Sequence, residues 1–282
     1  MIIDSHCHIW ENWPYRPSSP YAAGRGRAGE LVYEMDAHDV ARAVIICARI
    51  GDNSDNVDHA YRVAAAHPGR FEVFPDIDCR WSADYHRPGA AGRLENALSR
   101  WSFKGFTHYL DEKDDGSWLT GGEGLAFFGI AAARRLILSL SVLPHQMPAV
   151  VQLAERYPDL PILIHHFAFL GPRTAAMVDG RDLVLAAASC PNIHIKYSGL
   201  GNVAAPDQDF PYTPLRWILS DVAAAFGPER VVWGSDFPVS RKHMTYTQCL
   251  SLLTRHGPFA PIGLPRVLGG NMARLLETAG VN

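Results

Sequence analysis

The sequence of 282 residues lacks several features that mark large classes of protein. No apolar run approaches the ~20 residues that a membrane-spanning helix needs, so we expect no membrane partner. The chain has no block of lysine and arginine, and its formal net charge is −3, so we expect no nucleic-acid partner. Its first residues include an acid and two histidines, whereas a secretory signal has lysine or arginine before an apolar stretch.

Cysteine is scarce, and no pair has the CxxC spacing of a redox or zinc motif. Without a disulfide framework or a secretory signal, the chain is expected to be a reduced, cytoplasmic protein. No Walker-type loop occurs, and the first expected strand ends in Ser5-His6-Cys7-His8 rather than in the glycine-rich turn of a dinucleotide-binding fold. The five cysteines are Cys7, Cys47, Cys79, Cys190 and Cys249.

What is present is an alternation of short apolar runs with longer amphipathic stretches. Several runs are too uniformly apolar for half-exposed strands, which favours a parallel sheet buried on both faces. Eight such units in a chain of this length predict an α/β protein with a single (β/α)8 TIM barrel over residues 1–282. The expected strands are Ile2–His6, Ala43–Cys47, Phe71–Asp76, Phe103–Phe106, Leu136–Val142, Pro161–His166, Ile193–Tyr197 and Val231–Gly234. The expected helices are Glu30–Val40, Asp55–Ala66, Leu94–Trp101, Leu125–Arg135, Pro148–Tyr157, Arg181–Ser189, Pro214–Phe226, Gln248–Arg255 and Arg266–Leu276.

Histidines and an aspartate follow several of these strands, at the barrel end where active sites lie. His6 and His8 are two residues apart on the first strand, so both should face the lumen. Asp236 ends the last apolar strand, where burial of a charge is costly unless it is paired, metal-bound or catalytic. Two imidazoles with a carboxylate and a further histidine suit Zn²⁺, with Mn²⁺ or Fe²⁺ as alternatives.

The sequence does not decide whether the further histidine follows the fifth strand or belongs to the sixth. His165 and His166 are adjacent, so only one of them is expected to face the lumen while the other packs under a helix. His145 follows the fifth strand and could be a ligand or only part of the turn into the next helix.

Five segments occur in a characteristic order: IDSHCH (Ile3–His8), Leu143–His166, KYSG (Lys196–Gly199), VVWGSDFP (Val231–Pro238) and GGNMARLL (Gly269–Leu276). Together they resemble the amidohydrolase superfamily, in particular the branch of aminocarboxymuconate-semialdehyde decarboxylase-like enzymes, 2-pyrone-4,6-dicarboxylate hydrolases and sugar lactonases. The resemblance covers the whole chain. The chain departs from the branch at His165–Ala168, where Asp-His-Leu-Gly is frequent, and at Thr107, where an arginine is frequent.

The resemblance implies a divalent metal held by His6, His8, Asp236 and either His145 or His166, with zinc preferred and manganese as an alternative. It implies hydrolysis of a lactone, in which Asp236 takes a proton from water and His166 orients or protonates the carbonyl oxygen. A metal-free version, with histidines as donors to the oxyanion, and a non-oxidative decarboxylation of an aromatic or dienoic acid both stay open.

The substrate is expected to be a small, anionic molecule. Lys104, Arg49 and Tyr197 lie near expected strand ends and are assigned to substrate binding, with Arg173 and Arg241 as further cations. The sequence leaves open whether the chain forms a homo-oligomer.

Overall fold

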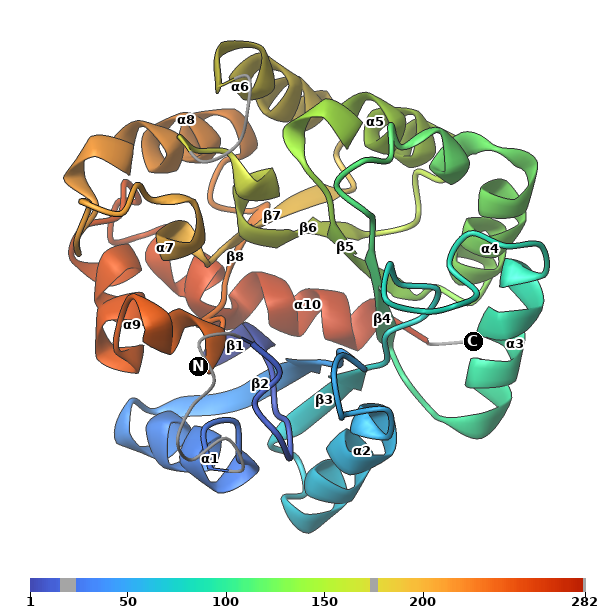
Figure 1. Cartoon of the computed structure of the whole chain (residues 1–282). Coiled ribbons are helices and arrows are strands. Elements are labelled where there is room, and N and C mark those ends of the chain that lie inside the picture. The colour runs from blue at the N-terminus through green and yellow to red at the C-terminus, as the bar shows by residue number, and fades with distance from the viewer. Residues whose placement is uncertain (16–23, 173–176, 281–282) are drawn as a thin grey trace.

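Eight parallel strands surround a central lumen in the computed structural model, which describes residues 1–15, 24–172 and 177–280 (Figure 1). This is the (β/α)8 barrel that the alternation of segments predicts. The strands are β1 (Ile2–Cys7), β2 (Val40–Ile46), β3 (Phe71–Phe74), β4 (Gly105–Tyr109), β5 (Ile137–Ser141), β6 (Ile162–Ile164), β7 (Ile193–Tyr197) and β8 (Val231–Trp233).

The barrel consists of two continuous sheets, β1-β2-β3 and β4 to β8, joined at two seams. At one seam the amide of Thr107 donates to Pro75 O at 2.8 Å. At the other, the amide of Asp236 donates to His6 O at 2.8 Å and that of His8 to Phe237 O at 2.6 Å. The second seam therefore brings the ends of β1 and β8 together, although 230 residues separate His6 and Asp236 in the sequence.

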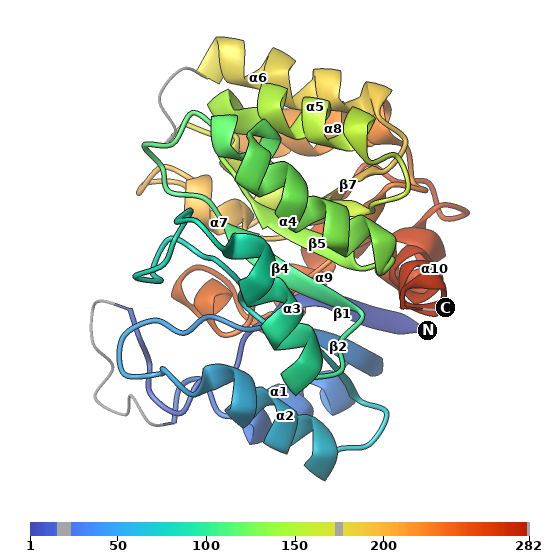
Figure 2. The same cartoon turned by 90° about the vertical axis from the view of Figure 1, so that its right-hand side faces the viewer.

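Helices cover the outside of the barrel, as α3 and α4 do over β4 (Figure 2). No helix in the described part of the chain is both long and apolar enough to cross a membrane. The helices are α1 (Ala28–Ala37), α2 (Asn56–Ala66), α3 (Ala90–Arg100), α4 (Gly122–Ala133), α5 (Met147–Arg156), α6 (Met177–Ala186), α7 (Leu200–Val203), α8 (Arg216–Phe226), α9 (Tyr246–Thr254) and α10 (Asn271–Thr278).

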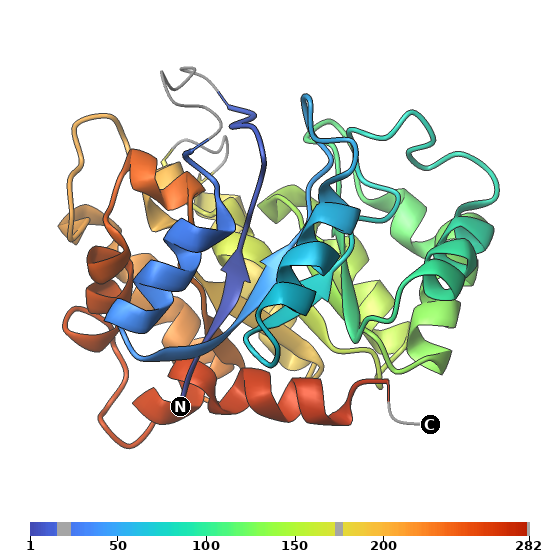
Figure 3. The ribbon, with the colours of Figure 1, turned by 90° about the horizontal axis from the view of Figure 1, so that it is seen from below.

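The two ends of the lumen differ in chemistry. An apolar cluster that includes Ile3, Val44 and Phe74 fills the end where the strands begin, and Met272 of α10 packs against it. Helix α10 lies across this end, next to the N-terminus, whereas the loops that follow the strands lie at the opposite end (Figure 3). Apolar side chains therefore close the end of the barrel where the strands begin.

The fourth strand lies further along the chain than Phe103–Phe106. It begins at Gly105, where a Cβ atom would meet the ring of Phe74 at 2.5 Å and Ile137 O at 2.7 Å. Only glycine allows this approach, and the strand runs from Gly105 to Tyr109. Lys104 consequently precedes the strand, at the apolar end of the barrel.

Candidate active site and metal centre

The ends of β1, β6 and β8 carry a buried cluster of histidines around one carboxylate. Oδ1 of Asp236 lies 3.6 Å from Nε2 of His6, 3.5 Å from Nε2 of His8 and 3.7 Å from Nε2 of His166. The two Nε2 atoms of His6 and His8 are 3.2 Å apart. One carboxylate oxygen thus faces three imidazole nitrogens.

A register shift in β1 helps to place His6. The pairing of β1 with β2 is irregular between Asp4 and Cys7. Ile3 lies in the inner apolar cluster, whereas Cys7 lies in the outer layer between strands and helices, although a regular strand would put residues four apart on one face. The shift lets Asp4 accept hydrogen bonds from the amides of His6 and Ser235 at 3.1 and 2.8 Å while the ring of His6 enters the lumen.

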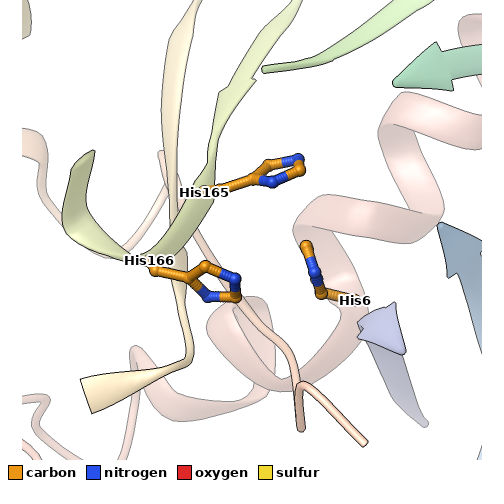
Figure 4. A group of neighbouring side chains, drawn as sticks. All are labelled: His6, His165 and His166. Atoms are coloured by element: carbon orange, nitrogen blue, oxygen red, sulfur yellow. The ribbon is translucent and has the colours of Figure 1, made fainter. Parts of the chain in front are cut away.

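Both histidines after β6 lie at the cluster, so the expectation that only one would face the lumen was wrong. β6 ends at Ile164, and the backbone turns left-handed at His166, with φ 48° and ψ 45°. The alternation of side chains in an extended strand no longer holds after such a turn. The rings of His6, His165 and His166 converge, and a nitrogen of each lies within 4.8 Å of the others (Figure 4).

Asp236 is held as an anion by its neighbours. Burial alone would raise the pKa of its carboxyl group, but His166, His8 and Asn202 outweigh burial and hold the pKa below its usual value. Nδ2 of Asn202, on α7, donates to Oδ2 at 2.9 Å. Asp236 itself has a φ of 56°, in the left-handed region that aspartate tolerates better than most residues.

Three of the histidines, His6, His165 and His166, are held neutral. Burial, followed by the positive charge of Lys196, keeps the pKa values of His6 and His165 well below 6.5. Burial also lowers the pKa of His166 to about 4, against the attraction of Asp236. Neutral imidazoles offer a lone pair, which a metal or a proton donor can use.

The cluster fits a single divalent ion. Tetrahedral zinc with bonds of about 2.0–2.1 Å separates its ligand atoms by roughly 3.4 Å, close to the 3.2–3.6 Å found among His6, His8 and Asp236. Nδ1 of His8 lies 2.7 Å from Ile46 O, which can only accept, so Nε2 of His8 presents its lone pair to the cluster. Nδ1 of His166 lies 2.8 Å from Oγ of Ser198, which can donate or accept, so either nitrogen of the His166 ring can carry the hydrogen.

A buried lysine beneath the cluster was not assigned a role from the sequence. Nζ of Lys196, on β7, lies 3.1 Å from Nδ1 of His6 and donates to Oγ of Ser139 at 2.6 Å. Burial lowers the pKa of Lys196 to about 7, and the carboxylates of Asp4 and Asp236 oppose this effect. Its position inside an apolar strand was the signal in the sequence, because a lysine there needs a partner.

A cavity of about 200 Å³ opens above the cluster, and His8, His166 and Asp236 line it. Its other polar lining residues are Tyr15, Arg80, Tyr109, Glu112, Ser141, Gln146 and Asn202. Tyr109 and Ser141 end β4 and β5, whereas the other five lie on loops or short helices, where the sequence pattern does not predict the direction of a side chain.

His145 does not join the cluster. It lies in a short 3-10 helix (Pro144–Gln146), its side chain is exposed, and its Nε2 is 2.9 Å from Asp114 O. The structure therefore removes His145 from the expected ligands. His165, which directly follows β6, lies beside His6 instead.

The residues assigned to substrate binding lie elsewhere as well. Lys104 is at the closed end, where its carbonyl accepts from the amide of Ile137 at 2.9 Å. Arg49 follows β2, but its guanidinium group binds Asp76 at 2.9 Å. Tyr197 points out of the barrel and donates to Leu252 O at 3.2 Å. None of the three lines the cavity described above.

The two further cations expected to bind the substrate, Arg173 and Arg241, are not found at the cavity in the described residues. Arg241 pairs with Glu30 on the surface. Arg173 lies outside the described residues. The cation that does line the cavity, Arg80, has its Nη1 atom 3.2 Å from Oε1 of Glu112.

Comparison with known proteins places these residues in context. A family model described as amidohydrolase matches residues 3–277. An L-fucono-1,5-lactonase from Burkholderia ambifaria is 32% identical over 144 residues, or 49% of this chain and 47% of that protein. The match thus spans about half the length of that relative. An L-fucono-1,5-lactonase from Burkholderia multivorans is 24% identical over 275 residues, covering 90% of this chain and 88% of that protein.

The fold is also found among solved structures. A crystal structure of an amidohydrolase from Burkholderia multivorans with bound zinc has a TM-score of 0.80 and 22% identity. The superposition covers 99% of both chains. At this identity the likeness establishes the barrel.

Proposed function

Since the chain belongs to the amidohydrolase family, whose model spans residues 3–277, we propose that it is a hydrolase that opens a lactone. The observation that carries this proposal is the position of Asp236, whose Oδ1 faces three imidazole nitrogens beneath an open cavity. A carboxylate held as an anion beside neutral histidines combines a proton acceptor with groups that can stabilise an oxyanion.

In this mechanism a water molecule attacks the carbonyl carbon of the lactone, and Asp236 accepts the proton that the water loses. His166 hydrogen-bonds to the carbonyl oxygen as it gains charge. Asp236 then returns the proton to the ring oxygen as the bond between that oxygen and the carbonyl carbon breaks. The product is a hydroxy acid, which ionises at neutral pH and releases one proton per turnover.

His6, His8 and Asp236 would hold a divalent ion, zinc in the first place and manganese as the alternative, with His166 as a further ligand. Such an ion would supply a Lewis acid for the carbonyl group. Asp236 remains the proton acceptor in the metal-loaded and the metal-free protein alike.

The cavity favours a lactone that carries hydroxyl groups. The side chains of Tyr15, Tyr109 and Ser141 line the cavity with hydroxyl groups that can exchange hydrogen bonds with such a substrate. This choice agrees with the names of the two Burkholderia relatives, both described as L-fucono-1,5-lactonases, which act on a sugar lactone. Binding of the anionic substrate expected from the sequence would depend on Arg80, which would have to exchange Glu112 for the substrate.

The test is a panel of sugar lactones, carboxylate-bearing lactones and aromatic carboxylic acids, followed by a pH indicator and by CO2 detection. We expect proton release without CO2 from at least one lactone. Stoichiometric CO2 from an aromatic or dienoic acid, with every lactone inert, would establish decarboxylation instead.

A further inference from the structure

The wall of the cavity carries an ion pair to which the proposed mechanism gives no task. Nη1 of Arg80, on the loop after β3, lies 3.2 Å from Oε1 of Glu112, on the loop after β4. Both residues line the cavity above the cluster. The side chain of Arg80 is 39% exposed and that of Glu112 71%, so a molecule from solution can reach both. A substrate that enters the cavity therefore meets a cation and an anion side by side.

Hydrogen bonds fix the backbone on both sides of the pair. The amide of Arg80 donates to the carbonyl oxygen of Tyr109, at the end of β4, at 3.0 Å. Next to Glu112, the carbonyl oxygen of Asp111 accepts from Nε2 of Gln146 at 2.8 Å. Gln146 is itself buried. The two charges are thus attached to ordered backbone before a substrate binds, which lowers the entropy cost of binding.

The charges on the cavity wall do not favour an anionic substrate. Among the residues that the structure describes, the lysines, arginines, aspartates and glutamates that line the cavity are Arg80, Glu112 and Asp236. The single guanidinium group faces two carboxylates, and one of these already pairs with it. Lys242 does not line the cavity, and its Nζ atom lies 4.3 Å from the ring centre of Tyr15. The described wall therefore offers no unpaired cation to a substrate carboxylate.

A hydroxyl group fits this ion pair better than a carboxylate does. A hydroxyl group can accept a hydrogen bond from Arg80 and donate one to Glu112 at the same time, so the two charges stay balanced. A carboxylate can only accept, so it would bind Arg80 and leave Glu112 unpaired beside a like charge. Repulsion of the wrong ligand is one of the two ways in which a site gains specificity.

We propose that Glu112 is a specificity-determining residue that selects uncharged, polyhydroxylated lactones over lactones that carry a carboxylate, because it holds Arg80 in an ion pair. This inference rests on the proposed lactone hydrolysis, and it replaces the anionic substrate expected from the sequence with an uncharged one. A divalent ion at the cluster would add the same charge to every variant. Comparison of two lactones on one protein preparation therefore isolates the contribution of Glu112.

The direct test compares D-glucono-1,4-lactone with D-glucaro-1,4-lactone, which differ only at the terminal carbon, a hydroxymethyl group in the first and a carboxylate in the second. We expect the wild type to open gluconolactone with the higher kcat/KM. Glu112→Gln keeps the shape of the side chain and removes its charge. It should raise kcat/KM for glucarolactone about tenfold, and lower it for gluconolactone by up to about fivefold, because an amide accepts more weakly than a carboxylate. The gain should shrink in about 1 M salt, which screens exposed charges.

Two further variants separate a local effect from a change in overall charge. Glu277→Gln removes the same formal charge from an exposed position on α10, at the closed end of the barrel (Figure 3). It is the matched control and should change the ratio of the two kcat/KM values less than about twofold. In an Arg80→Gln background, Glu112→Gln should give a smaller gain for glucarolactone, because no guanidinium group is left for the substrate to bind.

A binding measurement tests the same idea without turnover. Quinate is a ring-shaped polyhydroxy carboxylate with no ester bond to hydrolyse, and calorimetry should show that Glu112→Gln binds it at least about fivefold more tightly than the wild type. A wild type that prefers glucarolactone, an unchanged ratio of the two lactones in Glu112→Gln, or quinate binding that is equal or absent in both proteins would overturn the proposal. If neither lactone is opened while Glu112→Gln binds quinate more tightly, the proposed function fails and the role of Glu112 in charge selection stands.

Discussion

Asn202 and Asp236 are joined by a hydrogen bond of 2.9 Å from the amide of Asn202 to Oδ2 of the carboxylate. This bond occupies one oxygen and leaves Oδ1 to the three histidines. Asn202 lies on α7, a helix of four residues after β7, so a short segment that has no strong sequence pattern orients the central carboxylate.

Replacement of that carboxylate tests its role as proton acceptor. Asp236→Asn keeps the volume of the side chain and removes the charge, so we expect kcat for the lactone to fall about 10²–10⁴-fold. The melting temperature should change little or fall, because His166, His8 and Asn202 stabilise the charge of Asp236 in the folded state. A folded variant with near-native turnover would show that Asp236 only packs or caps the chain here.

Metal content should depend on the histidines of the cluster and not on His145. Elemental analysis of the wild type, purified without added metal, is expected to give up to one equivalent of a divalent transition ion. His8→Ala should lose it, since Nε2 of His8 presents a lone pair to the cluster. His145→Ala, at an exposed position, should retain both metal and activity. Equal metal loss in both variants would contradict this assignment.

Two glycine substitutions should have opposite effects on stability. Gly199 has φ +64°, and a Cβ atom there would meet Nδ1 of His166 at 2.4 Å. Gly199→Ala should therefore destabilise the protein and displace His166, lowering kcat. Gly92, inside α3, has nothing within 4 Å, so Gly92→Ala should stabilise by about 0.5–1 kcal/mol with unchanged turnover. Urea unfolding of both variants measures whether the free energy of unfolding falls for Gly199→Ala and rises for Gly92→Ala.

Acid should destabilise the metal-free protein. An unfolded histidine binds a proton below about pH 6.5, whereas His166 does so only near pH 4, so the unfolded state binds more protons between these values. Over this range His166 alone should lower the free energy of unfolding by roughly 3 kcal/mol, and His6 and His165 act in the same direction.

Asp4 opposes part of this effect. Burial raises its pKa to about 6, so the folded state binds its proton first and gains stability as the pH falls from 6 toward 3.8. Asp76 acts in the same direction as Asp4, whereas His86, His108 and His194 act with the three histidines of the cluster, so the net change is still a loss. Urea unfolding at pH 7 and pH 5 measures it, and His165→Gln should show a smaller difference than the wild type. Equal stability at both pH values would contradict the buried neutral histidines.

The sequence by itself determined the barrel and part of its site. Alternation of apolar strands with amphipathic helices depends on local periodicity, and the carboxyl ends of parallel strands meet at one end of a barrel. The positions of His6, His8 and Asp236 at strand ends were therefore enough to predict that the three lie together. Their distance along the chain does not matter, because the closed barrel brings β1 next to β8.

The tertiary structure decided what depends on register and backbone direction. β4 begins at Gly105, so Lys104 precedes the strand at the closed end, and a left-handed turn at His166 brings both His165 and His166 to the lumen. His145 points into a surface contact with Asp114 O. Lys196 could be recognised as exceptional within an apolar strand, but only the packed lumen shows that its partners are His6 and Ser139. Such contacts join residues from different strands, and no local pattern in the sequence encodes them.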